Sequence, residues 1–254
     1  MTNTPGWIRK FHRAKAEAAA PLLIFPHAGG GASIYRPFSK QLSADFDVIL
    51  FQYPGRQDRA AEAALTTLPD IAAGAFAEFV RSPFNRDQPI TVFGHSLGAL
   101  VAFEFTRLAE AAGVPVRLLG VSGAVAPWKV EELPPHPTED EELLDHLAGL
   151  NGTGADVMGN RELMRMTLPV LKADYRAFDA YSCPVEVTLN VDIHAMGGGD
   201  DDFVTIGDLH AWQRHTTQDL EVSVFDGGHF YIHDNVDGIV EVLTAELVSP
   251  QAGR

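Results

Sequence analysis

The chain has 254 residues, of which 46% are hydrophobic and 21% charged, as is ordinary for a globular protein that buries its own core. Its 19 lysines and arginines against 34 aspartates and glutamates give a net charge of −15, which argues against nucleic acid or a membrane surface as a partner. The single cysteine, Cys183, excludes a disulfide within the chain and suits a reducing compartment. The first apolar run is too short for export or for spanning a bilayer, so we expect a cytoplasmic protein.

Strand and helix patterns alternate through the first half of the chain. Short apolar runs predict strands at 21–27, 47–53, 88–95 and 116–124. Apolar residues at helical spacing predict helices at 33–42, 68–80 and 97–112, the last ending before Gly113. Such alternation predicts an α/β fold with a mostly parallel central sheet and helices on both faces.

The alternation stops at about 131–182. Helical stripes occur there, with Pro169 as an expected break or kink, and we interpret the segment as a helical insertion into one domain spanning residues 1–254. Strict apolar–polar alternation at 185–196 then predicts another strand. A helix from about Thr205, a strand at 220–225 and a helix from about His233 complete the chain.

The stretch Gly94-His95-Ser96-Leu97-Gly98 matches the pattern G-x-S-x-G, between an expected strand and an expected helix. In a nucleophile elbow this sharp turn lifts the serine above the sheet, and both glycines are needed because a Cβ there would clash. The alternative is a small residue in a tight bend. The strand before Ser96 and the helix after it favour the nucleophile.

A serine nucleophile needs a base and an acid downstream. Among the ten histidines, His229 directly follows a strand on a Gly-Gly turn, whereas His215 and His233 fall in expected helices. The strand at 116–124 ends without a carboxylate, so the acid is expected in the loop after the next strand. That loop offers Asp200, Asp201 and Asp202, and the residues alone do not choose among them.

The chemistry also needs an oxyanion hole of two backbone N–H groups. One donor is expected at Leu97, directly after the nucleophile. The other is expected at Ala28, in the glycine-rich loop after the first strand. Phosphate binding by this loop is the weaker alternative, because the loop lacks the lysine of a P-loop and the spacing of a dinucleotide fingerprint.

Five segments, which together span nearly the whole chain, carry a family resemblance: IFPHAGGGASIYRPF, QYPGRQDR, FGHSLGALVAFE, DDFVTIGDLHAWQRHT and FDGGHFYI. As a set they resemble the type II thioesterases, the discrete editing enzymes that accompany polyketide and nonribosomal peptide synthetases in antibiotic biosynthesis. The resemblance implies an α/β-hydrolase fold with the insertion at about 131–182 as a lid. It also places the acid at Asp201, beside Ser96 and His229.

The reaction that the resemblance implies is hydrolysis of an acyl thioester held on the phosphopantetheine arm of an acyl or peptidyl carrier protein. No cofactor and no metal are expected, because no metal-ligand spacing occurs, and we expect a monomer. The apolar stripe of the insertion either lines the acyl pocket or packs on the core. The alternatives are a generic carboxylesterase or an acyltransferase on the same scaffold, or a non-catalytic acyl-binding partner.

Docking to a carrier poses an electrostatic question, because carrier proteins are usually acidic and so is this chain. Docking should therefore use apolar contacts or a local basic patch. The candidate basic clusters are Arg9, Lys10, Arg13 and Lys15, and Arg56 with Arg59. The alternative is that both clusters are scattered solubilising charge.

Overall fold

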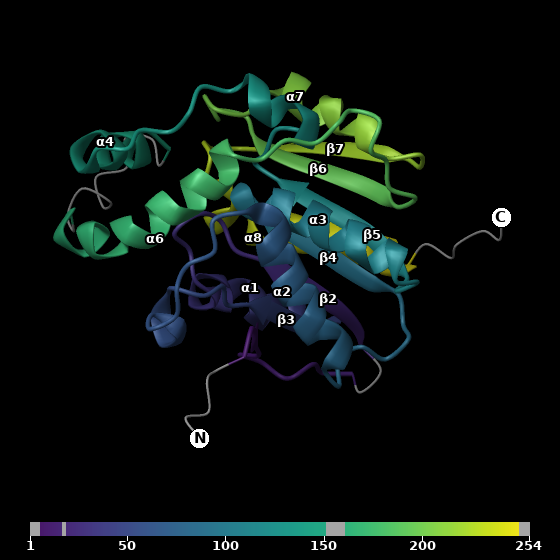
Figure 1. The fold of residues 1–254 in the computed structure, drawn as a ribbon. Coiled ribbons are helices and arrows are strands. Elements are labelled where there is room, and N and C mark those ends of the chain that lie inside the picture. Colours follow the sequence, from purple (N-terminus) through teal and green to yellow (C-terminus); the bar gives the residue numbers. More distant parts are fainter. Residues whose placement is uncertain (1–5, 17–18, 151–160, 249–254) are drawn as a thin grey trace.

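The computed structural model describes residues 6–16, 19–150 and 161–248. Across these residues the centre is a seven-stranded sheet in the order β1-β3-β2-β4-β5-β6-β7 (Figure 1). The strands are β1 (Ile8–Arg9), β2 (Ala20–Phe25), β3 (Phe46–Phe51), β4 (Ile90–His95), β5 (Val116–Ser122), β6 (Asp192–Gly198) and β7 (Leu220–Phe225). β1 pairs antiparallel with β3, and the remaining neighbours in this sheet are parallel. The expected mostly parallel sheet is confirmed.

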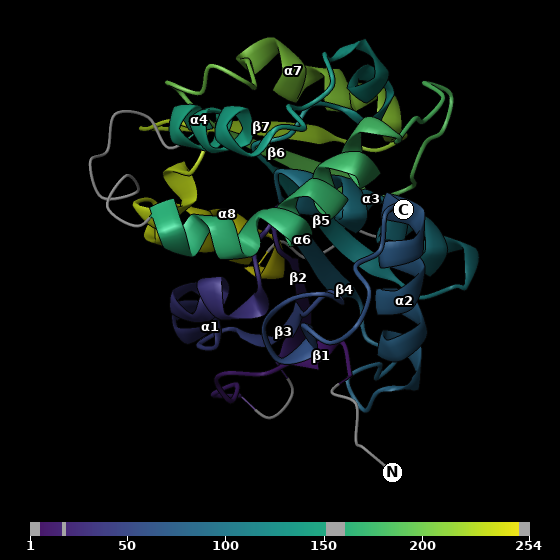
Figure 2. The same cartoon turned by 60° about the vertical axis from the view of Figure 1, so that its left-hand side comes forward.

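Helices cover both faces of the sheet. Figure 2 shows α1 (Arg36–Leu42) and α8 (Val236–Val248) on one side and α2 (Leu68–Arg81) and α3 (Leu97–Ala111) on the other. A shorter helix, α7 (Ile206–His210), follows β6, and the 3₁₀ turns are η1 (Ala32–Tyr35), η2 (Gln57–Arg59), η3 (Pro127–Glu132), η4 (Ala211–His215) and η5 (Tyr231–His233).

The central strands are apolar at nearly every position because each face meets a helical layer. In β2, Leu23 and Phe25 pack into the core beneath α2 and α3. Leu22 and Ile24 pack into the opposite core with residues of α1 and α8. A strand buried on both faces therefore reads as a continuous apolar run.

Two helices of the insertion lie together over one end of the sheet (Figures 1 and 2). They are α4 (Asp140–Leu150) and α6 (Arg161–Asp179). Of the break or kink expected at Pro169, the break is wrong, because α6 continues through this proline. Their contact is a separate apolar cluster formed by Leu143, Leu144, Leu168, Leu171 and Tyr175. Residues 151–160 of the insertion lie outside the described residues.

The strand predicted at 185–196 is wrong in its first half. β6 begins at Asp192, and before it the structure has a turn and an isolated bridge between Leu189 and Thr216. Leu189 and Val191 are buried, so the alternation marks an extended segment with one side against the core. In β6 burial does not alternate, because nearly every residue of this strand is buried, including the polar His194.

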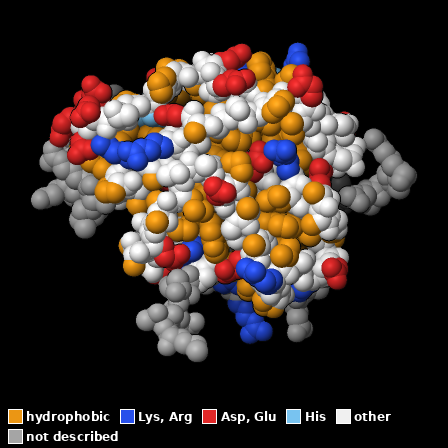
Figure 3. Space-filling model, viewed as in Figure 1, with side chains coloured by type: hydrophobic (Ala, Val, Ile, Leu, Met, Phe, Trp, Pro, Cys, Tyr) orange, Lys and Arg blue, Asp and Glu red, His pale blue; other side chains and the backbone are white. Residues whose placement is uncertain are grey.

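The surface reflects the acidic composition. Acidic side chains gather over α4 (Figure 3), whose first turn contains Asp140, Glu141 and Glu142. Carboxylates at this position favour the helix because its N-terminus carries partial positive charge. Within the described part of the chain, no helix is long and apolar enough to cross a bilayer.

Candidate active site

Ser96 lies on the sharp turn between β4 and α3, with φ 55° and ψ −126°. This conformation is unusual for a residue with a side chain and is typical of functional positions held by their surroundings. A Cβ on Gly94 would lie 2.1 Å from the oxygen of Gly98, and a Cβ on Gly98 would lie 2.1 Å from the oxygen of Phe25. Both glycines are therefore required for the close packing of α3 on β2 and β4.

The structure brings Ser96, His229 and Asp201 into one hydrogen-bonded chain. Ser96 Oγ lies 3.0 Å from His229 Nε2, and His229 Nδ1 lies 2.8 Å from Asp201 Oδ2. Because an ionised carboxylate only accepts hydrogen bonds, it places the imidazole proton on Nδ1. The lone pair on Nε2 is then free to accept the proton of the Ser96 hydroxyl.

Among the three aspartates of the loop after β6, Asp201 is the one that points inward. Its side chain is fully buried, whereas Asp200 and Asp202 are exposed. The second oxygen of Asp201 accepts the backbone N–H groups of Phe203 and Val204 at 2.9 and 3.3 Å. These bonds fix the carboxylate plane against the imidazole.

Glycines let the loop that carries His229 approach the end of β6. A Cβ on Gly198 would lie 2.3 Å from the oxygens of Gly227 and Gly228. Backbone bonds from Gly199 N to Phe225 O and from Asp200 N to Gly227 O, at 2.8 and 2.9 Å, join the two loops. The glycines before the aspartates therefore bring acid and base within reach of each other.

Two further histidines lie beside His229 and are held neutral. Burial, followed by the charges of neighbouring histidines and Arg56, lowers the pKa of His27 to about 3. Burial, followed by neighbouring histidines, holds the pKa of His95 well below its usual range. The His95 ring centre lies 5.2 Å from that of His229. Neutral neighbours do not repel the positive charge that a base at His229 gains when it accepts a proton.

Leu97 and Ala28, the expected oxyanion donors, lie on neighbouring segments. Leu97 opens α3, where backbone N–H groups of the first turn have no partner within the helix. Ala28 lies in the loop that leaves β2, and the tight contact of Gly98 with Phe25 presses the start of α3 against the start of that loop.

Ser96 and His229 line a cavity of about 250 Å³. Strand-end residues form its floor, and the insertion forms its walls with His136, His146, Leu150, Tyr175 and Phe178. Among residues of the apolar stripe, Leu150 lines the cavity and Phe178 both lines it and packs against the main core, while the other leucines join α4 to α6.

Sequence reasoning missed the two histidines of the cavity wall. The His136 ring stacks on Tyr175 with centres 3.8 Å apart, and its Nδ1 lies 2.6 Å from Asp179. Burial, followed by the charges of His136 and His229, lowers the pKa of His146. Both residues are scattered among prolines and acidic residues in the sequence, with no spacing that marks a shared site.

The other candidate histidines have other partners. His215 Nδ1 donates to the oxygen of Val187 at 2.7 Å, and its Nε2 accepts the N–H of Trp128 at 3.2 Å. The ring of His233 stacks on Phe230. Both ring nitrogens of His215 are thus used in backbone contacts, which agrees with the choice of His229 as the candidate base.

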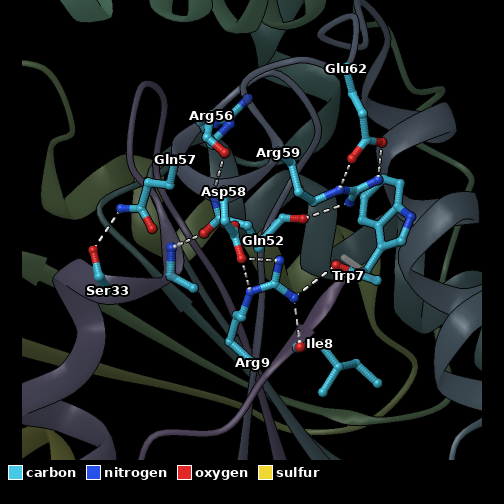
Figure 4. A network of polar contacts seen from close by, with 12 residues as sticks. Trp7, Ile8, Arg9, Ser33, Gln52, Arg56, Gln57, Asp58, Arg59 and Glu62 are labelled. Atoms are coloured by element: carbon cyan, nitrogen blue, oxygen red, sulfur yellow. Dashed lines mark hydrogen bonds and ion pairs between the residues drawn. The ribbon is translucent and has the colours of Figure 1, made fainter. Parts of the chain in front are cut away.

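The candidate cluster of Arg56 and Arg59 is buried, so these residues form neither a docking patch nor solubilising surface charge. Arg56 and Arg59 each keep only 5% of their side chain exposed. Figure 4 shows the Arg59 guanidinium between Glu62 and the ring of Trp7, with Nε 2.7 Å from Glu62 Oε1. The charges of both arginines are compensated inside the protein.

Among the described residues, no three or more histidines, cysteines, aspartates or glutamates form a group that could hold a metal ion. The buried Cys183 has a pKa raised by burial and is not among the described residues that line the cavity.

A mostly parallel sheet of this order, with a serine on the turn after β4 and a histidine and an aspartate on later loops, is the α/β-hydrolase fold. Residues 20–247 match the family model described as "Thioesterase domain". The chain belongs to this thioesterase family.

Similar proteins come from biosynthetic systems. The chain is 40% identical over 242 residues to phenyloxazoline synthase MbtB of Mycobacterium tuberculosis, covering 95% of this chain but 17% of that protein. It is 36% identical to thioesterase PikA5 of Streptomyces venezuelae, covering 95% of this chain and 85% of that one. Among solved structures, the type II thioesterase BorB of the borrelidin biosynthetic cluster superposes with a TM-score of 0.84 at 38% identity, covering 97% and 100% of the two chains.

Proposed function

We propose that this protein hydrolyses acyl thioesters carried on the phosphopantetheine arm of acyl or peptidyl carrier proteins, as an editing enzyme of polyketide or nonribosomal peptide biosynthesis. The observation that carries the proposal is the hydrogen-bonded chain from Ser96 through His229 to Asp201 at the mouth of a largely apolar cavity. The family membership supports the thioester as the bond that is cleaved. The names of the similar proteins support the biosynthetic setting.

Acylation begins when Ser96 Oγ attacks the thioester carbonyl carbon and its proton passes to His229 Nε2. The carbonyl oxygen becomes an oxyanion that accepts the N–H groups of Leu97 and Ala28. Collapse of this intermediate breaks the carbon–sulfur bond, and His229 returns its proton to the departing thiol. Asp201 keeps the imidazole oriented and stabilises its positive charge.

Deacylation repeats the sequence with water. His229 removes a proton from the water that attacks the acyl-enzyme, and Ser96 leaves with that proton. The acyl chain lies meanwhile in the cavity walled by α4, α6 and the segment after η3. In this proposal the insertion at about 131–182 is a lid that must open for the phosphopantetheine arm.

The test is deacylation of a carrier protein loaded with a short acyl group, followed by intact-protein mass spectrometry. The comparison is wild type against Ser96→Ala, with an oxygen ester of the same acyl group as a second substrate. Rapid loss of the acyl group that disappears in the variant is the expected result. Brisk, serine-dependent cleavage of the oxygen ester without carrier deacylation would contradict the proposal and indicate a general esterase.

A further inference from the structure

The loop after β2 is held by a buried ion pair that the proposed chemistry does not use. Arg56 follows β3, and Asp174 lies on α6. Their contact is bidentate, with Nη1 2.8 Å from Oδ2 and Nη2 2.7 Å from Oδ1. The Asp174 side chain is fully buried and that of Arg56 is 5% exposed. Because desolvation offsets much of the attraction between buried charges, stability alone is a weak explanation for such a pair.

Asp174 also binds the backbone of the loop that contains Ala28. Gly29 N donates to Asp174 Oδ2 at 2.7 Å, and Arg56 Nη1 donates to the oxygen of Gly30 at 3.2 Å. The pair thus binds the two residues that directly follow Ala28, because Asp174 accepts a hydrogen bond from Gly29 and Arg56 donates one to Gly30. Leu171, one turn before Asp174 on α6, lies against the same loop at Gly29.

The loop is a tight turn whose shape depends on one peptide plane. Gly30 N donates to the oxygen of His27 at 3.0 Å, and Gly29 has φ +71°, as the third residue of a type II turn requires. Type I and type II turns differ by a flip of the central peptide, here the one between Ala28 and Gly29. The bond from Gly29 N to Asp174 fixes the orientation of that peptide.

We propose that Asp174 and Arg56 are positioning residues for the oxyanion hole. They clamp the turn at 27–30 to α6, which sets the N–H of Ala28 opposite that of Leu97. This inference rests on the proposed function, in which these two N–H groups bind the oxyanion. Because Asp174 belongs to α6, the hole is complete only while this helix of the lid lies against the turn.

Two double variants separate positioning from packing. Arg56→Met with Asp174→Leu removes both charges and the acceptor for Gly29, and apolar replacement of a buried ion pair is often neutral for stability. Arg56→Gln with Asp174→Asn also removes both charges but leaves a side-chain oxygen to accept the N–H of Gly29. The two variants differ in the bond that the proposal invokes.

The first readout is steady-state hydrolysis of an acyl-N-acetylcysteamine thioester. The apolar double variant should lose about 10²-fold in kcat, with KM little changed, because a displaced oxyanion donor weakens only the transition state. The amide double variant should retain most of kcat. Full activity in the apolar variant, or equal losses in both at unchanged melting temperature, would overturn the proposal.

The second readout is inhibition by a trifluoromethyl ketone analogue of the substrate. Ser96 Oγ adds to the ketone carbon, the carbonyl π electrons become an alkoxide, and the Ser96 proton passes to His229 Nε2. The inhibition constant should rise in the apolar variant in parallel with the loss of kcat. The affinity for a thioether analogue that lacks the carbonyl should stay unchanged, and parallel weakening of both ligands would indicate general damage to the cavity.

A third measurement needs no variant and applies even if both double variants unfold. In the wild-type protein, the Gly29 amide should exchange its hydrogen as slowly as the amides of α6 around Asp174, because the two open together. Exchange that is orders of magnitude faster at Gly29 would overturn the clamp. If the wild-type protein hydrolysed no thioester, the proposed function would be contradicted instead. Ketone binding and hydrogen exchange would then still test whether Asp174 and Arg56 hold the turn at 27–30.

Discussion

Asp201 Oδ2 lies 2.8 Å from His229 Nδ1, while the other oxygen of this carboxylate accepts two backbone N–H groups. Asp201→Asn would preserve this shape but place an amide where the imidazole needs an acceptor that fixes its tautomer. We therefore expect kcat on a thioester substrate to fall by roughly 10⁴-fold with little change in the melting temperature.

Asp200→Asn and Asp202→Asn are matched controls, since both carboxylates are exposed neighbours in the same loop. Each removes the same negative charge as the variant at Asp201, so a general electrostatic effect would appear in all three. Both controls should keep wild-type kcat. A large loss at Asp200 or Asp202 with activity retained at Asp201 would show that the acid is assigned to the wrong residue.

Much of the fold could be predicted from the sequence because the central strands are buried on both faces. A run such as that of β4 has few interpretations, and the glycines around Ser96 mark a turn too tight for side chains at those two positions. The error at 185–196 has a physical reason. Alternating burial follows from one side of a chain lying on a core, and at Leu189 this occurs almost without ladder pairing.

The site could be predicted only where its chemistry is local in sequence. Ser96 and His229 each lie on a turn whose glycines are visible in the chain. The choice of Asp201 depends on which of three adjacent side chains turns inward, and that is decided by contacts with the loop before His229. Asp174 binds Gly29 across 145 positions of sequence, and no local pattern marks such a pair.

Ser96 adopts a backbone conformation, φ 55° and ψ −126°, that favours glycine. Such conformations cost of order 1–3 kcal/mol in a residue with a Cβ. Ser96→Gly and Ser96→Ala both remove the hydroxyl, but only the glycine relieves the strain. In urea unfolding, the glycine variant should be more stable than the alanine variant by about 1 kcal/mol. Equal stabilities would show that the turn stores no strain.

Gly98 is expected to be intolerant of any side chain. A Cβ there would lie 2.1 Å from the backbone oxygen of Phe25, which cannot rotate away. Gly98→Ala should lower the free energy of unfolding by about 3 kcal/mol or more, at the upper end of overpacking effects. It should also reduce kcat, because relief of the clash moves α3 and with it Ser96.

Gly113→Ala is the comparison for this clash. Gly113 has φ +73° and open space around the position of a Cβ, so only the backbone conformation opposes the change. Its cost should be about 1 kcal/mol, with kcat unchanged. If the two variants were equally stable, the close packing of α3 on β2 would not be the reason for the glycine.

The buried histidines His27 and His95 should make the protein sensitive to acid. Burial lowers the pKa of His27 from 6.5 to about 3 and holds that of His95 well below 6.5. Below pH 6.5 these histidines take up protons in the unfolded chain but stay neutral in the folded protein. Their contribution to stability is therefore fully present above pH 6.5 and is lost as the pH falls toward the pKa of the folded state. Each should reduce the free energy of unfolding by about 1.4 kcal/mol per pH unit in that window.

The measurement is urea unfolding between pH 7 and pH 4 for wild type and His27→Asn. The asparagine amide can still contact the hydroxyl of Tyr35, which lies 2.9 Å from His27 Nδ1, but it does not titrate. The variant should therefore show a shallower loss of stability below pH 6.5, whatever its stability at pH 7. His210→Asn, at an exposed position on α7, controls for the loss of a histidine as such. If the free energy of unfolding fell with pH equally steeply in His27→Asn and wild type, His27 would take up its proton in the folded protein as it does in the unfolded chain. The positive charge of His27 would then oppose the protonation of His229 that the proposed mechanism requires.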